Sequence, residues 1–300
     1  MKKALFIFIS VLIILSCHRK QAVLIESDNL SALILEYENW KRQRHLSLTK
    51  ADNWLSLVGL SWLKKGENFM GSGSDCNISL SGEYPEKLGK IILNDSIFFE
   101  TLNEKEIYCK GERFYSGQLR SDANPPYTTL TYQSLRWYII KRDNKYGVRI
   151  KDTLASTRMN FKGIEYFPYS ESMVLEVKVE ETHKDSVQIT NVLGFQSDNP
   201  IEAFLCFSYD DKDYKLAALD GGPLFYFLII SDNTTGFSTY GGGRYISVPR
   251  PRTGETTTQI DFNRAINPPC VFTDYATCPL PPKSNHLNFE VRAGEKKYHD

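Results

Sequence analysis

The sequence predicts an all-β or strongly β-dominated fold with one amphipathic helix near its N-terminus. Short strand-like runs separated by turn residues follow one another from Trp54 to Val248. The 300 residues include 17 Tyr and 17 Phe, and aromatic residues are favoured in strands. After the first helix, no strands alternate with long helical segments, which argues against a parallel α/β sheet. We therefore expect a β-sandwich-type region followed by a second β-rich region.

Residues 1–16 have the pattern of a secretory signal peptide. Lys2 and Lys3 precede an apolar run at residues 4–15, and this run is shorter than the ~20 residues that cross a bilayer as a helix. The small residue before Cys17 resembles the cleavage site of a bacterial lipoprotein signal, which implies that the Cys17 thiol carries the lipid. The alternative is an ordinary signal peptide followed by an incidental cysteine. We expect an exported protein that is attached to a membrane through the lipid on Cys17.

Residues 17–27 are expected to form a polar, basic tether between this lipid and the folded part of the chain. Residue 18 is His rather than Asp, and the tether has no run of acidic residues. In a host with two membranes, these features favour the periplasmic face of the outer membrane. We therefore expect a lipid-anchored protein of the cell envelope, on the extracytoplasmic side.

Charge and motifs exclude several classes of function. The 36 basic and 36 acidic residues cancel, so the basic surplus typical of nucleic-acid-binding proteins is missing and no nucleic acid partner is expected. The sequence contains no dinucleotide fingerprint, and we expect no cofactor. It also contains no C-x-x-C, and the spacing of its cysteines and histidines matches no compact ligand pattern, so no metal site is expected.

Residues 28–165 are expected to form one helix and the sandwich region. In residues 28–46 apolar side chains recur at three- and four-residue steps, as in Leu30, Leu33 and Tyr37, which is typical of an amphipathic helix. A boundary is expected near residue 165, and residues 166–300 would form the second region. The predicted strands are 91–93, 97–101, 128–132, 136–141 and 147–151 in the first region, and 174–179, 187–192, 203–209, 214–219, 224–230 and 245–248 in the second.

Residues 66–80 and 87–93 resemble the opening strands of a forkhead-associated sandwich. That family binds phosphothreonine through an Arg after its first glycine and through a Ser-x-x-His. Here Ser72 follows Gly71, and no Ser-x-x-His is present. The resemblance therefore implies the fold without the phosphopeptide site.

The most unusual segment is 260–298. Its prolines at 268, 269, 279, 281 and 282 each remove a backbone donor and fix φ, so this stretch is predicted to be a rigid, non-repetitive loop. Rigid loops that carry Asn, Arg, Asp and Cys side chains are common places for sites.

This segment contains three motifs. They read Asp-Phe-Asn-basic-Ala-x-Asn-Pro-Pro-Cys at 261–270, Cys-Pro-Leu-Pro-Pro-x-x-Asn-x-Leu at 278–287 and Ala-Gly-Glu-x-x-Tyr at 293–298. They resemble a bacterial family of unknown function, DUF1684, and Ile266 departs from it because an aromatic residue is more usual there. The resemblance extends to Thr239-Tyr240, to Gly243-Arg244 and to the segment that begins at Trp54. It implies a type of domain without an activity.

Arg244, Asp261 and Glu295 are the candidate catalytic residues. An arginine can hold an anionic group bidentately, and two carboxylates can divide the roles of acid and base. The alternative is that Arg244 neutralises Asp261 or Glu295 inside the fold. The candidate binding residues are the polar side chains of the same motifs, namely Tyr240, Asn263, Asn267 and Asn285.

Cys270 and Cys278 are expected to form a disulfide, because prolines stiffen the loop between and around them and an exported protein meets oxidising conditions. The alternative is a nucleophilic Cys270 with His286 as its base.

Two functions follow from these residues. The favoured one is a non-catalytic binding or envelope-interaction module. The alternative is a hydrolase that acts on a small anionic substrate through Arg244, Asp261 and Glu295. The chain contains no nucleophile elbow and no H-E-x-x-H, and this favours the module.

Overall fold

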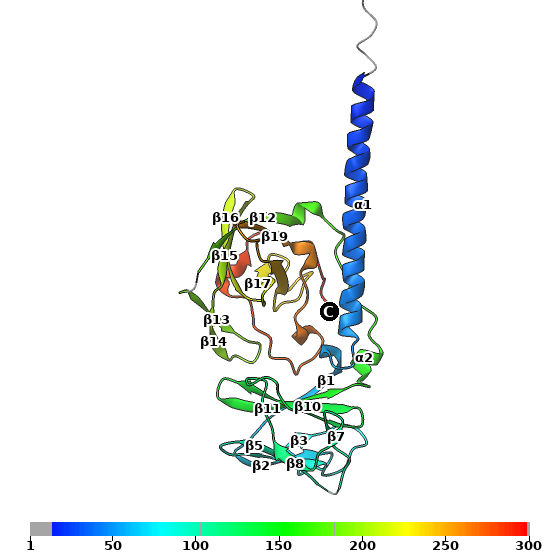
Figure 1. Cartoon of the computed structure of the whole chain (residues 1–300), viewed down its shortest axis with the longest axis vertical. Coiled ribbons are helices and arrows are strands. Elements are labelled where there is room, and N and C mark those ends of the chain that lie inside the picture. Colours follow the sequence, from blue (N-terminus) through cyan, green and yellow to red (C-terminus); the bar gives the residue numbers. More distant parts are fainter. Residues whose placement is uncertain (1–13, 103, 183, 299–300) are drawn as a thin grey trace, which may run out of the picture. The chain divides into compact units, whose positions relative to one another are not determined.

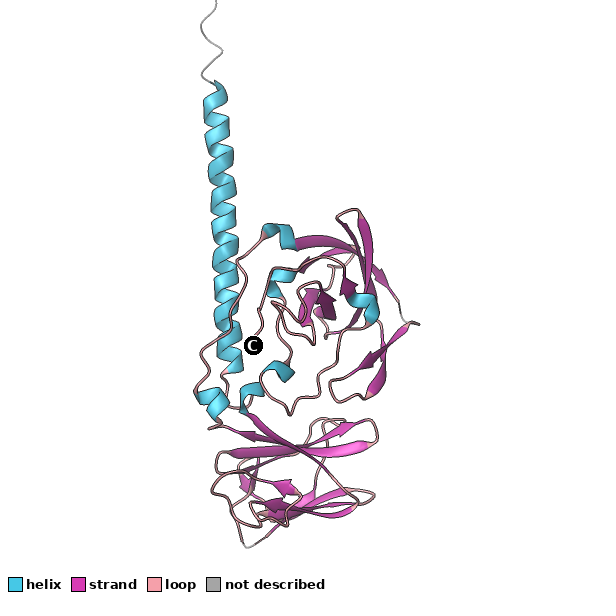
Figure 2. Ribbon diagram, turned by 180° about the vertical axis from the view of Figure 1, so that it is seen from behind, coloured by secondary structure: helices cyan, strands magenta, loops and turns pink. Residues whose placement is uncertain are grey.

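The computed structural model describes residues 14–102, 104–182 and 184–298. The chain divides into two compact units, Met1–Leu46 and Ser47–Asp300. Strands dominate the second unit, as Figures 1 and 2 show. The predicted β-dominated fold with one N-terminal helix is confirmed.

The helix α1 spans Ile14–Leu48 and is longer than predicted. It continues through residues 17–27, which we expected to be a tether, because neither Gly nor Pro interrupts it. Among the described residues, no helix combines the length and the apolar character that a membrane span needs. Most of the predicted signal peptide, residues 1–13, and the side chain of Cys17 lie outside the described part of the structure.

The strands at residues 57–152 form two sheets, blue to green in Figure 1. A six-stranded sheet has the order β1-β11-β10-β9-β6-β7, and a five-stranded sheet has the order β3-β2-β4-β5-β8. The strands are β1 (Leu57–Trp62), β2 (Gly66–Gly71), β3 (Ile78–Ser79), β4 (Gly89–Leu93), β5 (Ile97–Thr101), β6 (Tyr108–Cys109), β7 (Glu112–Arg113), β8 (Ser116–Gln118), β9 (Thr129–Tyr132), β10 (Leu135–Arg142) and β11 (Lys145–Asp152).

One hydrophobic core joins these two sheets. Ile91 and Phe99 of the smaller sheet and Trp137 of the larger one are all buried in it. In the larger sheet Trp137 lies opposite Ile150, whereas the next pair along the strands, Tyr138 and Arg149, faces the other side. The alternation that predicted the strands therefore places Arg149 on the outer face of the sandwich.

The strands at residues 174–287 form a second β-rich region. A seven-stranded sheet has the order β18-β17-β16-β15-β12-β19, with β20 paired to β17, and β13 and β14 form a hairpin. The main core of this region lies on one face of the larger sheet. The strands are β12 (Val174–Glu181), β13 (Ser186–Thr190), β14 (Gln196–Pro200), β15 (Ala203–Tyr209), β16 (Lys212–Asp220), β17 (Phe225–Asp232), β18 (Arg244–Pro249), β19 (Thr257–Asp261) and β20 (His286–Leu287).

Short helices fill the remaining segments. The α-helix α2 spans Ser156–Met159. Because the prolines of the C-terminal segment remove backbone donors, no longer helix forms there and the segment contains single 3-10 turns. The 3-10 helices are η1 (Trp54–Ser56), η2 (Glu171–Met173), η3 (Phe262–Arg264), η4 (Pro269–Val271) and η5 (Lys283–Asn285).

Candidate functional site

Arg244, at the start of β18, is buried with 1% of its surface exposed. Its Nη2 lies 2.9 Å from Oδ2 of Asp232 and also donates to the carbonyl of Val291 at 2.8 Å, while its Nη1 donates to the carbonyl of Ala293. Oδ1 of Asp232 accepts the backbone N–H of Thr234 at 2.8 Å and that of Val291 at 3.1 Å. The ion pair thus joins the ends of two strands to the C-terminal segment.

Electrostatics agree with a structural role for this arginine. Burial lowers the pKa of Arg244, and the charges of Asp232 and Glu295 oppose that shift. Glu295 is fully buried, and its Oε2 accepts the backbone N–H of Asn267 at 2.5 Å. Both carboxylates therefore balance the guanidinium inside the fold.

Asp261 lies apart from this arrangement. Its Oδ2 accepts a hydrogen bond from Nε of Arg264 at 3.1 Å, and its Oδ1 accepts the N–H of Asn263 at 3.0 Å, which caps η3. The structure brings Arg244 and Glu295 together but gives Asp261 a different partner. The acid that pairs with Arg244 is Asp232, which we did not predict. Its signal in the sequence is an Asp two residues before Thr234, a pattern typical of a side chain that bonds its own turn.

The three predicted asparagines are buried and bind backbone groups. Asn263 exchanges two hydrogen bonds of 2.9 Å with the backbone of Ser170. Asn267 donates to the carbonyl of Lys296 at 2.8 Å. Asn285 accepts the N–H of Ala217 and donates to the carbonyls of Ala217 and Ile229, at 2.8–3.0 Å. These bonds attach η5 to β16 and β17. These amides hold the C-terminal segment in place.

Cys270 and Cys278 lie side by side and are free thiols in this structure, and the disulfide between them stays a prediction. The backbone N–H of Cys270 donates to Sγ of Cys278 at 3.1 Å. A hydrogen bond from the Cys278 thiol, helped by one from Tyr240, lowers the pKa of Cys270 to about 7, although burial opposes this shift. The same contact, together with burial, raises the pKa of Cys278.

Tyr240 is therefore the one predicted binding residue that lies beside a reactive group. Tyr240 is half-buried, and burial raises the pKa of its phenol. A hydrogen bond to Cys270 and the negative charge of the Cys270 thiolate raise this pKa further. The proposed base His286 instead makes a 3.0 Å hydrogen bond with the hydroxyl of Ser231. Tyr240 and Cys278, rather than His286, stabilise the Cys270 thiolate.

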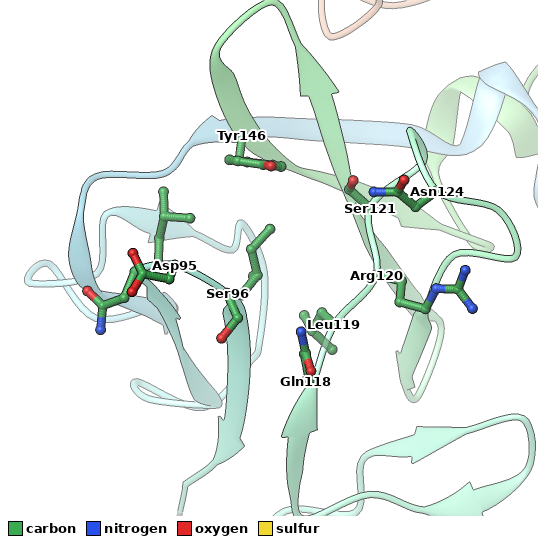
Figure 3. Close-up of a pocket in the computed structure, with 11 residues that line it drawn as sticks. Asp95, Ser96, Gln118, Leu119, Arg120, Ser121, Asn124 and Tyr146 are labelled. Carbon is green, nitrogen blue, oxygen red and sulfur yellow. The ribbon is translucent and has the colours of Figure 1, made fainter.

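A polar hollow of about 370 Å³ lies at one end of the sandwich (Figure 3). Asp95 and Ser96, in the turn between β4 and β5, line one side of it, Gln118 and Leu119 line the other, and Tyr146 lies above them, whereas the guanidinium of Arg120 points away from Asp95. None of the predicted site residues lines this hollow. Within the described ranges, no group of three His, Cys, Asp or Glu side chains is arranged to hold a metal ion.

Comparison with known proteins gives a family without an activity. Residues 159–296 match a family model described as "Protein of unknown function (DUF1684)". A search of curated proteins found no match. The chain is similar to an uncharacterized protein from Haloarcula marismortui whose structure was solved by solution NMR. The aligned residues are 30% identical and make up 46% of this chain and 78% of that protein, and the TM-score is 0.39.

Proposed function

The chain belongs to the DUF1684 family of proteins of unknown function, and we propose that it is a lipid-anchored binding module of the cell envelope. In this proposal Cys17 carries the lipid, and the β-rich part faces the extracytoplasmic side. In a host with two membranes, this would be the periplasmic face of the outer membrane. The module binds a partner or a small molecule without converting it.

The observation that carries the proposal is the internal use of Arg244. A hydrolase that holds an anionic substrate with Arg244 needs a guanidinium that faces a pocket. The contacts of Arg244 instead go to Asp232 and to two carbonyl groups, with 1% of the residue exposed. Asp261, the second residue that the hydrolase needs, is paired with Arg264. This arrangement supports the module over the hydrolase.

Anchoring is tested by incorporation of labelled palmitate in the native host. We expect wild type to be labelled and Cys17→Ala to be unlabelled. Equal labelling of both proteins, or labelling of neither, would contradict the anchor.

Binding without conversion is tested by a thermal-shift screen of small molecules of the cell envelope. We expect at least one compound to raise the melting temperature, because a ligand that binds the folded state stabilises it by mass action. After incubation with the protein, mass spectrometry should recover that compound unchanged. A compound that the protein hydrolyses, and that Asp261→Asn or Glu295→Gln no longer hydrolyses, would establish the alternative.

A further inference from the structure

Arg149 of β11 is a buried arginine without a carboxylate partner among the described residues. It is 3% exposed. Its Nη1 reaches the hydroxyl of Tyr138 at 3.4 Å and its Nη2 reaches that of Thr277 at 3.3 Å, both long contacts. Its Nε is buried without a hydrogen-bond partner in the structure. Arginine stays charged in proteins, so this guanidinium is a buried and uncompensated positive charge.

A second cation lies beside it. The guanidinium of Arg149 is 5.4 Å from the ring centre of Trp54, and Nζ of Lys151 is 5.9 Å from the same ring. Lys151 also lies 5.8 Å from the ring of Tyr138 and donates to the backbone carbonyl of Asp52. Two cations share one indole, and each raises the electrostatic cost of the other.

The surrounding charges do not compensate this pair. Burial lowers the pKa of Lys151, and so do the nearby charges of Arg149 and Arg136, while the carboxylate of Asp52 acts in the opposite direction. Asp52 forms no ion pair with either cation among the described residues. Around Lys151, three positive charges thus meet one carboxylate, which leaves a local surplus of positive charge. Arg142 also reaches Thr277, but it is paired with Asp122.

The position suits a ligand. Trp54, Tyr138, Lys151 and Thr277 are all half-buried, so the place where they meet Arg149 borders solvent. Aromatic rings beside a guanidinium and an ammonium group provide both an apolar contact surface and donors for an oxyanion. Thr277 lies in the C-terminal segment, between the first two motifs and inside the range that matches the family model, whereas the other four residues lie outside that range.

We propose that Arg149, Lys151, Tyr138, Trp54 and Thr277 form an anion-binding site, here called the Arg149 site. Its ligand carries a phosphate or carboxylate group that pairs with Arg149 and Lys151, and its remaining atoms pack against Trp54 and Tyr138. The bound oxyanion supplies the negative charge that the fold lacks. This proposal rests on the proposed binding function and names the chemistry of the ligand. Palmitate labelling at Cys17 tests the anchor separately. The screen of envelope compounds tests binding separately, because a compound that stabilises wild type and Arg149→Met equally would support the binding module and contradict the Arg149 site.

The experiment titrates the full chain, purified in a non-ionic detergent, with inorganic phosphate and with succinate at constant ionic strength. Melting temperature and tryptophan fluorescence are recorded, because Trp54 lies beside both cations. We expect a saturable rise in melting temperature with at least one probe. A response to phosphate alone assigns a phosphate-bearing ligand, and a response to succinate alone assigns a carboxylate-bearing one.

Arg142→Met is the matched control. Arg142 contacts the same hydroxyl of Thr277, at 3.2 Å, but has its own carboxylate, Asp122, at 2.8 Å. We expect this variant to bind the probe like wild type. Arg149→Met and Lys151→Met should each bind it at least about tenfold more weakly, because each removes one of the charges that hold the anion.

Folding and binding are separated in the same data. If Arg149→Met does not fold, Lys151→Met decides, because its side chain is half-buried and its loss leaves the packing of Arg149 in place. The proposal is overturned if neither probe shifts the wild type. It is also overturned if the variants of Arg149 and Lys151 that fold bind the probe as tightly as Arg142→Met does.

Discussion

Two arginines of this chain are equally buried, and their surroundings differ. Arg244, at 1% exposure, has a carboxylate at 2.9 Å and two carbonyl acceptors, and it joins the C-terminal segment to the large sheet. Arg149, at 3% exposure, has two long contacts to hydroxyl groups and a second cation nearby. Nε of each guanidinium is buried without a hydrogen-bond partner, so the two arginines differ in their counterions: Arg244 has a carboxylate, and Arg149 has none among the described residues.

This difference separates structure from function better than burial or residue type does. A guanidinium paired inside the protein has little left to offer a ligand, because a ligand would have to displace Asp232. An unpaired guanidinium already bears the cost of leaving water, and a bound anion would offset that cost. The C-terminal segment therefore supports the fold through the carbonyl groups that bind Arg244, and it contacts Arg149 through Thr277.

The largest expected effect tests the structural half of this comparison. Asp232→Asn leaves the buried Arg244 without its counterion, and we expect the free energy of unfolding to fall by about 3–5 kcal/mol. Urea unfolding followed by circular dichroism measures this loss.

The matched control is the same substitution at Asp261. Its ion pair with Arg264 is partly exposed, with 26% of the Asp261 side chain and 39% of the Arg264 side chain accessible. Asparagine keeps an acceptor for the cap of η3, so we expect a loss below about 1 kcal/mol. Equal losses in the two variants would show that the buried pair is not the stronger support.

The strands could be predicted because their signal is local. Trp137, Ile139, Val148 and Ile150 alternate with polar residues, and the structure places these four in the sandwich core. The same alternation gave no sign that Arg149 is buried, because it places this residue on the outer face of the sheet. Arginine at an outward position of a strand is usually solvated, but here Trp54 and a distant segment that contains Thr277 pack against it.

The candidate site could be predicted only in part. The motif residues Arg244 and Glu295 are brought together, but the partner of Arg244 comes from the end of β17, a segment outside the motifs. Local sequence shows which residues are unusual and does not show which strands lie side by side. The helix was predicted too short, because polar composition alone suggested a tether in residues 17–27, where no residue breaks a helix.

The thiol pair provides the next test, with an intermediate effect. Oxidised glutathione can accept attack by the Cys270 thiolate, which releases one glutathione thiol, and attack by Cys278 on that mixed disulfide releases the second. We expect the resulting Cys270–Cys278 bond to raise the free energy of unfolding by about 2–3 kcal/mol, since it closes a short loop. Peptide mapping without reduction identifies the bond, and Cys278→Ser should remain at the mixed disulfide.

The pH dependence of this reaction follows from the lowered pKa of Cys270. Half of the thiol is ionised at a pH of about 7, so its alkylation by iodoacetamide should rise as pH increases through that value and level off above it. Cys206 is the control, because burial raises the pKa of its thiol and its reaction should begin at higher pH. Identical pH profiles for the two cysteines would contradict the assignment of Cys270 as the reactive thiol.

The smallest expected effect belongs to a third arginine, which lies between the two extremes. Arg142 has a carboxylate partner like Arg244 and contacts Thr277 like Arg149, but 31% of its side chain is exposed. Water already screens its pair with Asp122, so Arg142→Met should lower the free energy of unfolding by less than about 1 kcal/mol.

Arg149→Met should keep or raise the free energy of unfolding, because methionine removes an uncompensated charge from a buried position. If Arg149→Met loses more stability than Arg142→Met in urea unfolding, Arg149 is a support of the fold, and the contrast with Arg244 disappears.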